Sequence, residues 1–533
     1  SKFGTHMAYL VRQWQADRVI MFFGMNESFA GEKGVNRFKK QLTSYLSLIK
    51  TRHPNSTYVL VSPTAVEPGH SPQLPNADER NLDLQLYSEA MKDIAGQQGV
   101  SFVDLFQSSK ELYKQSEEKL TDNGIQLNGK GNAAIAKKLA AALTSAEKVS
   151  AIDTATDAFS ALKYLVSRKA QEVATAYHPA NGISYYGLRA RTYEYKPEIP
   201  HLLKVANLLD QNIWQQAGDL NSAHPFPEIP ILRATMPSTK PRRGLGIIKS
   251  AKDDLEDFTV AEGFEVNCFA SSEDYPELIN PLQIQFDAKG RLWVACFSSY
   301  PHPLPGAVSN DKILIFEDTN KDGKADKKTV FADNLKLPDG FVFYKQGIIA
   351  SVSRKLIYLA DSDGDSKADI KTELLRGLDD SDTHHSGYLA RTPQGDVLLS
   401  EALFHRGQLE TPHGVIHTKD SSIMSFDPAS GKITVERQTE APNPWKITFN
   451  QWGESIQFYG GGQIIDADLY NVWTPMGLSA PKELGMPFRY DKGCTCTFVE
   501  SPHFPESWQG GLLTGHLLST NEVNFTPLKF VDG

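Results

Sequence analysis

The chain has 533 residues, a formal net charge of −9, and 40% apolar and 22% charged residues. Because a domain typically spans about 100–200 residues, this length predicts a multidomain protein. The apolar content suffices for large cores, whereas the acidic balance argues against a nucleic-acid-binding surface. No apolar run reaches the ~18 residues that cross a bilayer, so we expect no transmembrane segment.

The start of the chain and the cysteines say little about cellular context. The sequence begins with Ser1 inside a helical pattern and without a signal region, so we expect a fragment of a longer protein. The four cysteines form neither a C-x-x-C pair nor a zinc set, and they leave the redox compartment open. They are Cys268, Cys296, Cys494 and Cys496.

Short apolar runs alternate with amphipathic segments in the N-terminal part of the chain. Strands are predicted over 18–24, 57–63 and 100–106, and helices over 35–52, 81–99 and 133–143. This alternation is typical of a parallel sheet covered on both faces. We therefore predict a three-layer α/β domain of flavodoxin-like type, with its working loops at the carboxyl ends of the strands.

The pattern changes twice along the rest of the chain. A helical extension is followed by a proline-rich stretch that is typical of a linker. Beyond the linker the apolar period becomes two, which predicts an almost entirely β structure. The predicted domains are an α/β domain over 1–146, a helical extension over 147–222, a linker over 223–254 and a β domain over 255–533.

The β region contains an internal repeat. A turn glycine precedes a strand at Gly290, Gly347, Gly395 and Gly453, at separations of 57, 48 and 58 residues. Four short antiparallel strands in each ~50 residues predict the blades of a β-propeller. At least four blades begin, and ring closure is not visible before the chain stops, so we predict an incomplete propeller.

Two acidic loops in the β region share the spacing of a calcium-binding turn. Alternating oxygen side chains on a tight loop suit a hard cation that takes six to eight oxygen ligands. Backbone carbonyls of Lys324 and Lys367 would add ligands, whereas Thr329 and Thr372 replace the glutamate of an EF-hand, so we expect modest affinity. The alternative is a pair of ordinary acidic hairpin turns. The candidate ligands are Asp318, Asn320, Asp322, Lys324 and Asp326 in the first loop and Asp361, Asp363, Asp365, Lys367 and Asp369 in the second.

The stretch "FFGMNESFAG" resembles the third conserved block, G-x-N-D, of the SGNH (GDSL-type) hydrolases. Gly24 and Asn26 match that block, while Glu27 replaces its aspartate. The resemblance implies that the Gly24 N–H and the Asn26 amide are oxyanion donors, a role that suits neutral, prepositioned groups. The alternative is a loop asparagine that caps the following turn.

The last block of that superfamily, D-x-x-H, supplies the acid and the base of the catalytic triad. On "DNGIQLN" the acid position falls on Asn123 and the base position on Gln126, and Asp122 is one residue out of register. A carboxamide cannot shuttle a proton as an imidazole does. The serine-bearing G-D-S strand would precede Ser1, so the resemblance implies an N-terminally truncated and inactive SGNH domain. Esterase activity in the full-length protein is an alternative.

The stretch "DTHHSGYLARTPQGDVLL", with "EGFEVNCFAS" and "APNPWKITFNQWGES", resembles the membrane-bound-dehydrogenase-type propeller of large planctomycete proteins. Those proteins commonly join the propeller to an SGNH domain and to a downstream haem-binding C-x-x-C-H module. The resemblance implies an extracytoplasmic protein whose electron-accepting haem c lies outside this segment.

This propeller is similar to soluble quinoprotein sugar dehydrogenases. The similarity implies that His385 is the catalytic base beside pyrroloquinoline quinone (PQQ). The quinone-binding Arg-Asn pair falls on Pro442 and Asn443, so only Asn443 remains for the cofactor. We therefore expect an oxidoreductase-like propeller acting on a carbohydrate or alcohol, with a noncatalytic carbohydrate-binding scaffold as the alternative; a structural role of the His384–His385 pair fits the latter.

Overall fold

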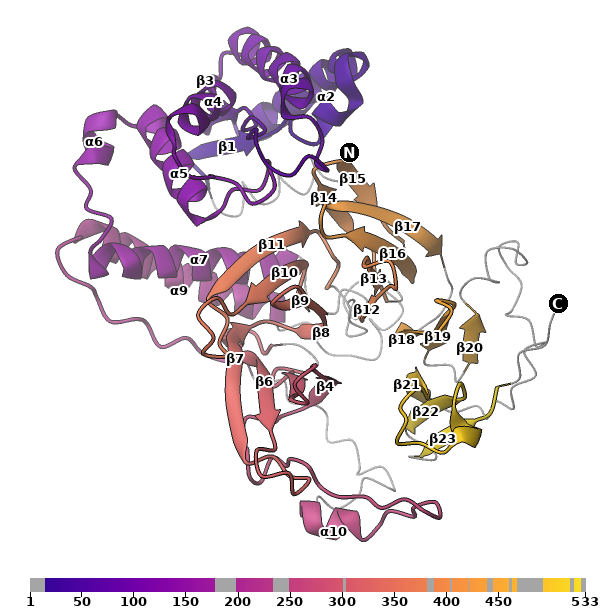
Figure 1. Cartoon of the computed structure of the whole chain (residues 1–533). Coiled ribbons are helices and arrows are strands. Elements are labelled where there is room, and N and C mark those ends of the chain that lie inside the picture. Colours follow the sequence, from indigo (N-terminus) through magenta and orange to yellow (C-terminus); the bar gives the residue numbers. More distant parts are fainter. Residues whose placement is uncertain are drawn as a thin grey trace. The chain divides into compact units, whose positions relative to one another are not determined.

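The structure is a computed structural model that describes residues 15–177, 198–232, 249–300, 303–380, 388–402, 405–419, 421–438, 444–459, 463–466, 492–517 and 522–528. The chain divides into two compact units. Unit 1 contains the described residues up to Asp153 together with Glu410–Ile416 and Ala429–Lys432, and unit 2 contains the others. Figure 1 shows the elements of both units along the chain.

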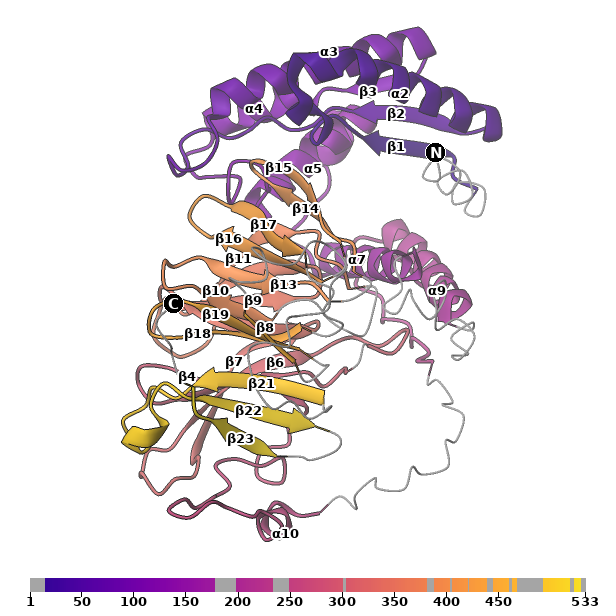
Figure 2. The same cartoon turned by 90° about the vertical axis from the view of Figure 1, so that its right-hand side faces the viewer.

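Unit 1 is a three-layer α/β structure, as predicted. Its strands β1, β2 and β3 form a parallel sheet in that order. Alternate side chains of β2 point to opposite faces, so Tyr58 and Leu60 join the core under α2 and α3, whereas Val59 and Val61 join the core under α5. Figure 2 shows α5 on the face of the sheet opposite α2 and α3. The elements are β1 (Arg18–Phe22), η1 (Glu27–Ala30), α2 (Gly31–Arg52), β2 (Thr57–Val61), α3 (Ala77–Gln98), β3 (Ser101–Val103), α4 (Leu105–Gln115), α5 (Gly129–Leu143) and α6 (Ala146–Ser150).

The third strand is shorter than the sequence pattern predicts. It ends at Val103, because the Asp104 carboxylate accepts the Gln107 N–H at 2.9 Å and caps α4. Leu105 and Phe106 are therefore buried on a helix rather than on a strand. The N-cap Asp104 therefore begins a helix where the apolar run predicted a continuing strand.

Unit 2 begins with a helical pair. Helix α7 (Asp157–Tyr177) packs against α9 (Glu198–Gly218), and their contact is built on Leu165, Val205 and Leu209. A short helix, α10 (Ala251–Leu255), precedes the first β-strand. Among the described helices, none combines the length and apolar character needed to cross a bilayer.

The described chain from β4 onward forms five sheets, which confirms the predicted propeller-like β region with at least four blades. Their orders are β4-β5-β6-β7, β15-β14-β11-β10-β9-β8, β12-β13-β16-β17, β18-β19-β20 and β21-β22-β23. The strands are β4 (Pro281–Phe286), β5 (Leu292–Cys296), β6 (Asp311–Glu317), β7 (Lys327–Leu335), β8 (Pro338–Tyr344), β9 (Gly347–Val352), β10 (Lys355–Ala360), β11 (Ile370–Arg376), β12 (Leu389–Arg391), β13 (Val397–Ser400), β14 (Gln408–Thr411), β15 (Gly414–His417), β16 (Ser422–Asp427), β17 (Lys432–Gln438), β18 (Pro444–Phe449), β19 (Ser455–Tyr459), β20 (Gln463–Asp466), β21 (Lys492–Phe498), β22 (Leu512–Leu517) and β23 (Val523–Thr526).

The first strand of each sheet is an inner strand. Each of β4, β8, β12, β18 and β21 is the edge of its own sheet, and successive members of this series contact one another. The side chain of Gln283 on β4 links two of them, accepting the Phe341 N–H at 2.7 Å and donating to the Phe341 carbonyl at 2.9 Å. Edge strands that pack around a common axis are the arrangement of propeller blades.

Four of the five inner strands share a local irregularity. Pro338 pairs with Val352 and Gly340 pairs with Ser351, so Asp339 is the extra residue of a β-bulge. The same two-against-one pairing recurs at the beginning of β4, β18 and β21, where the extra residues are Leu282, Trp445 and Cys494. The repeat noticed in the sequence therefore extends to the backbone geometry of the strands.

Candidate functional site

The turn after β1 places the predicted oxyanion residues at the carboxyl end of that strand. Gly24 has a φ of +99°, and a Cβ there would lie 3.1 Å from Pro63 Cδ, so only glycine fits. Its N–H donates to Glu27 Oε2 at 2.9 Å. Asn26 follows at the start of η1 and makes no side-chain cap bond there. The residue that replaces the family aspartate thus occupies one of the two predicted oxyanion donors.

The predicted acid and base positions do lie side by side, as two amides. Asn123 Nδ2 donates to Gln126 Oε1 at 3.3 Å. Asn123 Oδ1 accepts the backbone N–H groups of Ile125 at 3.2 Å and Gln126 at 2.9 Å, which fixes the turn. The loop therefore brings together two amides, and neither side chain can exchange a proton.

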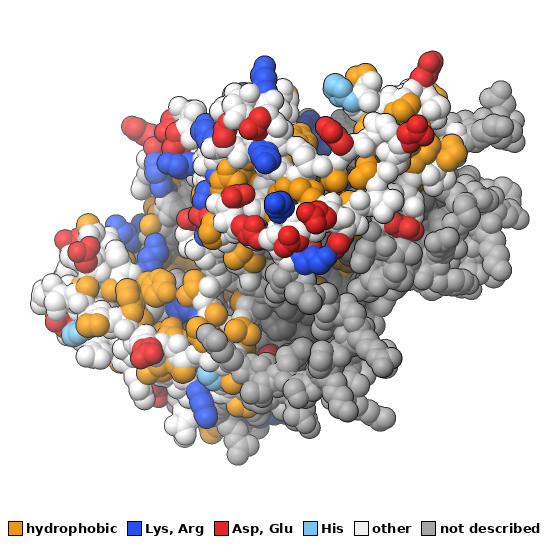
Figure 3. Space-filling view, turned by 90° about the horizontal axis from the view of Figure 1, so that it is seen from below, with side chains coloured by type: hydrophobic (Ala, Val, Ile, Leu, Met, Phe, Trp, Pro, Cys, Tyr) orange, Lys and Arg blue, Asp and Glu red, His pale blue; other side chains and the backbone are white. Residues whose placement is uncertain are grey.

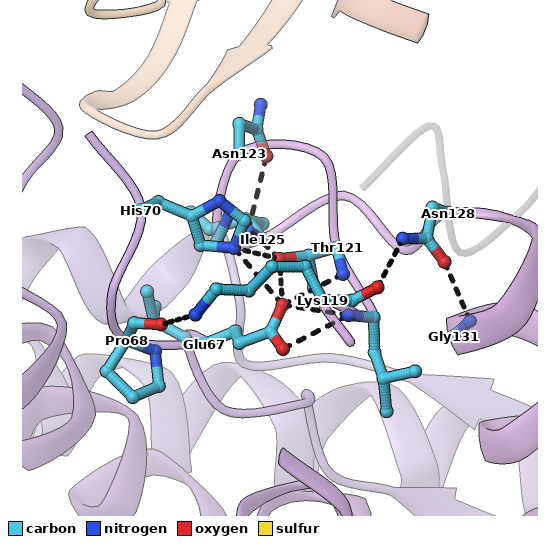
Figure 4. Close-up of polar contacts among 12 residues, drawn as sticks. Glu67, Pro68, His70, Lys119, Thr121, Asn123, Ile125, Asn128 and Gly131 are labelled. Atoms are coloured by element: carbon cyan, nitrogen blue, oxygen red, sulfur yellow. Dashed lines mark hydrogen bonds and ion pairs between the residues drawn. The ribbon is translucent and has the colours of Figure 1, made fainter. Parts of the chain in front are cut away.

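A carboxylate–imidazole cluster, missed by the sequence reasoning, adjoins this loop (Figure 4). Glu67 Oε2 lies 3.1 Å from His70 Nε2, 2.6 Å from Thr121 Oγ1 and 2.9 Å from the Thr121 backbone nitrogen. The Leu120 N–H also donates to both Glu67 oxygens at 3.1 Å. Burial acts to raise the pKa of Glu67, but hydrogen bonds from Thr121, Leu120 and His70 outweigh it and hold that pKa below its ordinary value.

The cluster forms part of the wall of a cavity of about 320 Å³. Glu67 and His70 come from the loop after β2, so they lie at the working edge of the sheet. Their side chains are 3% and 13% exposed. The sequence signal that could have revealed this cluster is a glutamate and a histidine three residues apart, shortly after a buried strand. The other wall residues that bear on the chemistry are Asn76, Asp78, Arg80, Asn123, Gly124 and Ile125.

The two acidic loops of unit 2 have the same backbone. Asp318 accepts the N–H groups of residues three and five positions later, and Asp361 does the same. Positive φ values also fall at those positions, on Lys321 and Gly323 in the first loop and on Gly364 and Ser366 in the second. Gly364 of the second loop stands two positions earlier in the turn than Gly323 of the first loop, but the backbone conformation of the turn is the same.

Three predicted ligands of the second loop converge. One carboxylate oxygen from each of Asp361, Asp363 and Asp365 lies within 4.8 Å of the others. Asp369 instead accepts the Ser362 hydroxyl and N–H, as Asp326 does from Thr319 in the first loop. Asn320 holds the place of Asp363, while Asp318 and Asp322 correspond to Asp361 and Asp365. The side chain of Lys367 lies 3.3 Å from Asp365, and Lys324 donates its backbone N–H to Asp322 at 2.9 Å.

The predicted quinone-site residues lie outside the described residues. His385 falls within 381–387, and Asn443 falls within 439–443. The four cysteines are free thiols. Burial raises the pKa of Cys296 to about 11 and that of Cys496 to about 12, so neither is a thiolate nucleophile near neutral pH.

Two family models match the chain. Residues 3–134 match the GDSL-like Lipase/Acylhydrolase family, and residues 250–461 match a Domain of unknown function, DUF7133. Neither description is that of a quinoprotein or of a haem-binding C-x-x-C-H protein. A comparison with curated proteins gives no match.

Several solved structures are similar to parts of the chain. An acetylxylan esterase from Geobacillus stearothermophilus is 17% identical over 25% of this chain and 62% of its own, with a TM-score of 0.21. An alpha/beta hydrolase from the Lake Arreo metagenome is 19% identical over 27% and 66%, with a TM-score of 0.22. Virginiamycin B lyase from Staphylococcus aureus is 13% identical over 48% and 71%, with a TM-score of 0.26. The chain thus spans less than two thirds of that esterase, and the domain assignment depends on the family models.

Proposed function

Because the N-terminal part of the chain is a GDSL-like lipase/acylhydrolase domain, we propose that unit 1 binds carbohydrate in the cavity beside Asn123 and does not hydrolyse esters by the serine mechanism. The observation that carries the absence of hydrolysis is the amide pair at 3.3 Å between Asn123 and Gln126. An imidazole in this place would accept the serine proton and return it to the leaving group, and a carboxamide cannot do so.

The oxyanion turn supports the same conclusion. The Gly24 N–H already donates to the Glu27 carboxylate at 2.9 Å. An acyl-transfer site needs free donors where negative charge develops, and a fixed carboxylate in that place would repel an oxyanion. Loss of the base and occupation of a donor are independent changes, and both suppress hydrolysis.

The character of the cavity supports a small polar ligand. Its wall contains polar residues such as Glu67, His70, Asn76 and Asn123, and apolar residues such as Val66, Pro72, Leu74 and Ile125. Small-molecule sites combine apolar surface with a few placed polar groups, and in this wall the polar groups make up the larger part. A carbohydrate offers both the hydroxyl groups and the apolar ring faces that such a wall can contact.

Hydrolysis and binding can be measured on the same chain. We expect p-nitrophenyl acetate to be hydrolysed at the same rate by the wild-type chain and by Asn26→Ala, and at least one of xylotriose, cellotriose and chitotriose to bind in calorimetry. Faster hydrolysis by the wild type than by Asn26→Ala would favour the esterase alternative. Absence of binding by all three trisaccharides would contradict the carbohydrate proposal.

For the β region we keep sugar or alcohol oxidation as a second proposal, in an extracytoplasmic protein whose haem acceptor lies in another segment. His385 lies four positions before β12 and Asn443 directly before β18 in sequence, and these two inner strands contact each other. Proline at position 442 supplies no cation for a quinone. Reduction of a redox dye by sugars after addition of PQQ and Ca²⁺, and its loss in His385→Ala, would support oxidation; carbohydrate binding without dye reduction would favour a scaffold.

We also propose that Ca²⁺ binds the two acidic loops. The convergence of Asp361, Asp363 and Asp365 within 4.8 Å supports this for the second loop. The shared hydrogen-bond pattern of Asp318 and Asp361 extends the proposal to the first loop. Oxygen ligands without a bidentate glutamate give a site of modest affinity, which suits a structural ion outside the cytoplasm.

A further inference from the structure

The hydrogen bonds around Glu67 determine which nitrogen of His70 carries the proton. A carboxylate can only accept, so Thr121 Oγ1, at 2.6 Å from Glu67 Oε2, donates its single proton there. Thr121 Oγ1 also accepts the Gly124 N–H at 3.0 Å. His70 Nε2 lies 2.8 Å from Thr121 Oγ1 and 3.1 Å from Glu67 Oε2. A bare lone pair on Nε2 would face a carboxylate oxygen, so Nε2 carries the hydrogen.

The other nitrogen of the ring is then a lone-pair acceptor in the neutral imidazole. Figure 4 shows one ring nitrogen of His70 turned toward Thr121 and Glu67 and the other turned away from them. Cδ2 faces Gly124, 3.8 Å from the position that a Cβ would take there. Within the described part of the chain no residue pairs with Nδ1, and the side chain lines the cavity.

We propose that His70 Nδ1 accepts a hydrogen bond from a hydroxyl group of a neutral carbohydrate in this cavity, with Glu67 and Thr121 holding the ring in the required tautomer. The inference rests on the proposed function and names the group that selects the ligand. A carboxylate or phosphate ligand fits poorly, because the wall carries Glu67 and Asp78 and the Arg80 guanidinium is already bound to Asp83 at 2.9 Å.

Two substitutions of His70 test the roles of its Nδ1 and Nε2 atoms separately. In His70→Asn the amide lies near the place of Nδ1, whereas in His70→Gln it lies near the place of Nε2 and can still donate to Glu67. The probe is whichever of xylotriose, cellotriose and chitotriose the wild-type chain binds, and the control ligand is its peracetylated form, which has no hydroxyl donors. We expect His70→Gln to keep the wild-type Tm and to weaken binding about five- to tenfold, the effect of one neutral hydrogen bond.

The matched variant, His70→Asn, should differ from His70→Gln in both stability and binding. We expect His70→Asn to lower the Tm, since the bond to Glu67 is lost, and to retain more of the affinity than His70→Gln. The peracetylated ligand should bind the wild type and His70→Gln equally weakly. If His70→Gln binds the trisaccharide as the wild type does, or if the peracetylated form binds as well as the free sugar, the inference is wrong while carbohydrate binding stands.

The tautomer has a spectroscopic test that needs no ligand. In the full chain labelled with ¹⁵N-histidine, the His70 signals, assigned by their absence in His70→Gln, should show a protonated Nε2 and an unprotonated Nδ1 at a pH where the ring is neutral. A protonated Nδ1 would overturn the inference. Failure of the wild-type chain to bind any of the three trisaccharides would overturn both the inference and the proposed function.

Discussion

Asp339 has a buried carboxyl group. It is 8% exposed at the bulge that opens β8, and among the described residues its Oδ1 has no hydrogen-bond partner. Burial above all, and then the charges of Asp380 and Asp311, raise the pKa of Asp339 well above its ordinary value. The folded protein therefore holds this proton more tightly than the unfolded chain does.

The sign of this shift gives a prediction. Because its pKa is raised in the folded state, the Asp339 carboxyl group contributes its full stabilisation below the unfolded pKa of about 3.9. This contribution is lost as pH rises through the folded pKa. We expect Asp339→Asn, which cannot ionise, to gain stability relative to the wild type as pH rises from 4 to 9, reaching roughly 1–3 kcal/mol, the cost of an unsatisfied buried group.

Thermal unfolding of both proteins across this pH range is the measurement. The control is Asp333→Asn, because Asp333 is exposed on β7. A stability difference between Asp339→Asn and the wild type that is constant with pH would show that Asp339 does not titrate in this way.

At the scale of single elements, the N-cap of α5 fixes the loop that holds the amide pair and the Glu67 cluster. Asn128 Oδ1 accepts the Gly131 N–H at 2.9 Å, and Asn128 Nδ2 donates to the Lys119 carbonyl at 2.7 Å. Gly131 itself packs on the Leu120 carbonyl, where a Cβ would come within 1.9 Å. The start of the helix and the loop from 119 to 128 are therefore held together by hydrogen bonds and close packing.

Two N-caps of unit 1 allow a comparison. Asn76 caps α3 by accepting the N–H groups of Asp78 at 2.9 Å and Glu79 at 3.3 Å. We expect Asn76→Ala to lower the free energy of unfolding by about 1 kcal/mol, the usual cost of a lost N-cap. Asn128→Ala should cost more, because it also removes the bond to Lys119. Urea unfolding measures both, and an equal or smaller effect of Asn128→Ala would contradict the coupling of the cap to the loop.

At the scale of the whole molecule, the chain contains two compact units with separate cores. Leu46 is fully buried in unit 1, whereas the acidic loops belong to unit 2. On the face in Figure 3, acidic and basic side chains are interspersed over the described residues, as expected for a modest net charge. Units with their own cores are expected to respond separately to changes made in one of them.

Calcium should therefore act on one unit only. We expect millimolar Ca²⁺ to raise the unfolding temperature of unit 2 and to leave that of unit 1 unchanged, since a ligand stabilises the unit that binds it. Asp363→Asn should reduce this shift. Scanning calorimetry with Ca²⁺ and with chelator measures it, and Mg²⁺ is the ion control. An equal shift in Asp363→Asn would exclude the second loop as a site.

A substitution in the core of unit 1 shows which unfolding transition belongs to that unit. Leu46→Ala should lower the stability of unit 1 by about 2–5 kcal/mol, the range for a fully buried leucine. The transition that Ca²⁺ raises should not move in this variant. A single transition that shifts with both Leu46→Ala and Ca²⁺ would mean that the two units unfold together.

Local patterns in the sequence were enough to predict the layers of unit 1 and the blades of unit 2, whereas the assignment of the acid and base positions to Asn123 and Gln126 stays a prediction. These features depend on residues close in sequence, since apolar period, turn glycines and block spacing are local. The shortened third strand was missed, because the cap by Asp104 competes with an apolar run. The assignments of His385 and Asn443 to a quinone site stay predictions, as these residues lie outside the described chain.

The sequence by itself determined that Asn123 and Gln126 are carboxamides, because residue identity alone decides whether a group can carry a proton. Only the tertiary structure decided that Glu67 and His70 meet Thr121, and that the Glu27 carboxylate occupies the Gly24 N–H. Residues 51 to 54 positions apart come together there because the loop after β2 contacts the loop between α4 and α5. Asp339 was likewise indistinguishable from a surface aspartate until the bulge and the neighbouring sheets showed its burial.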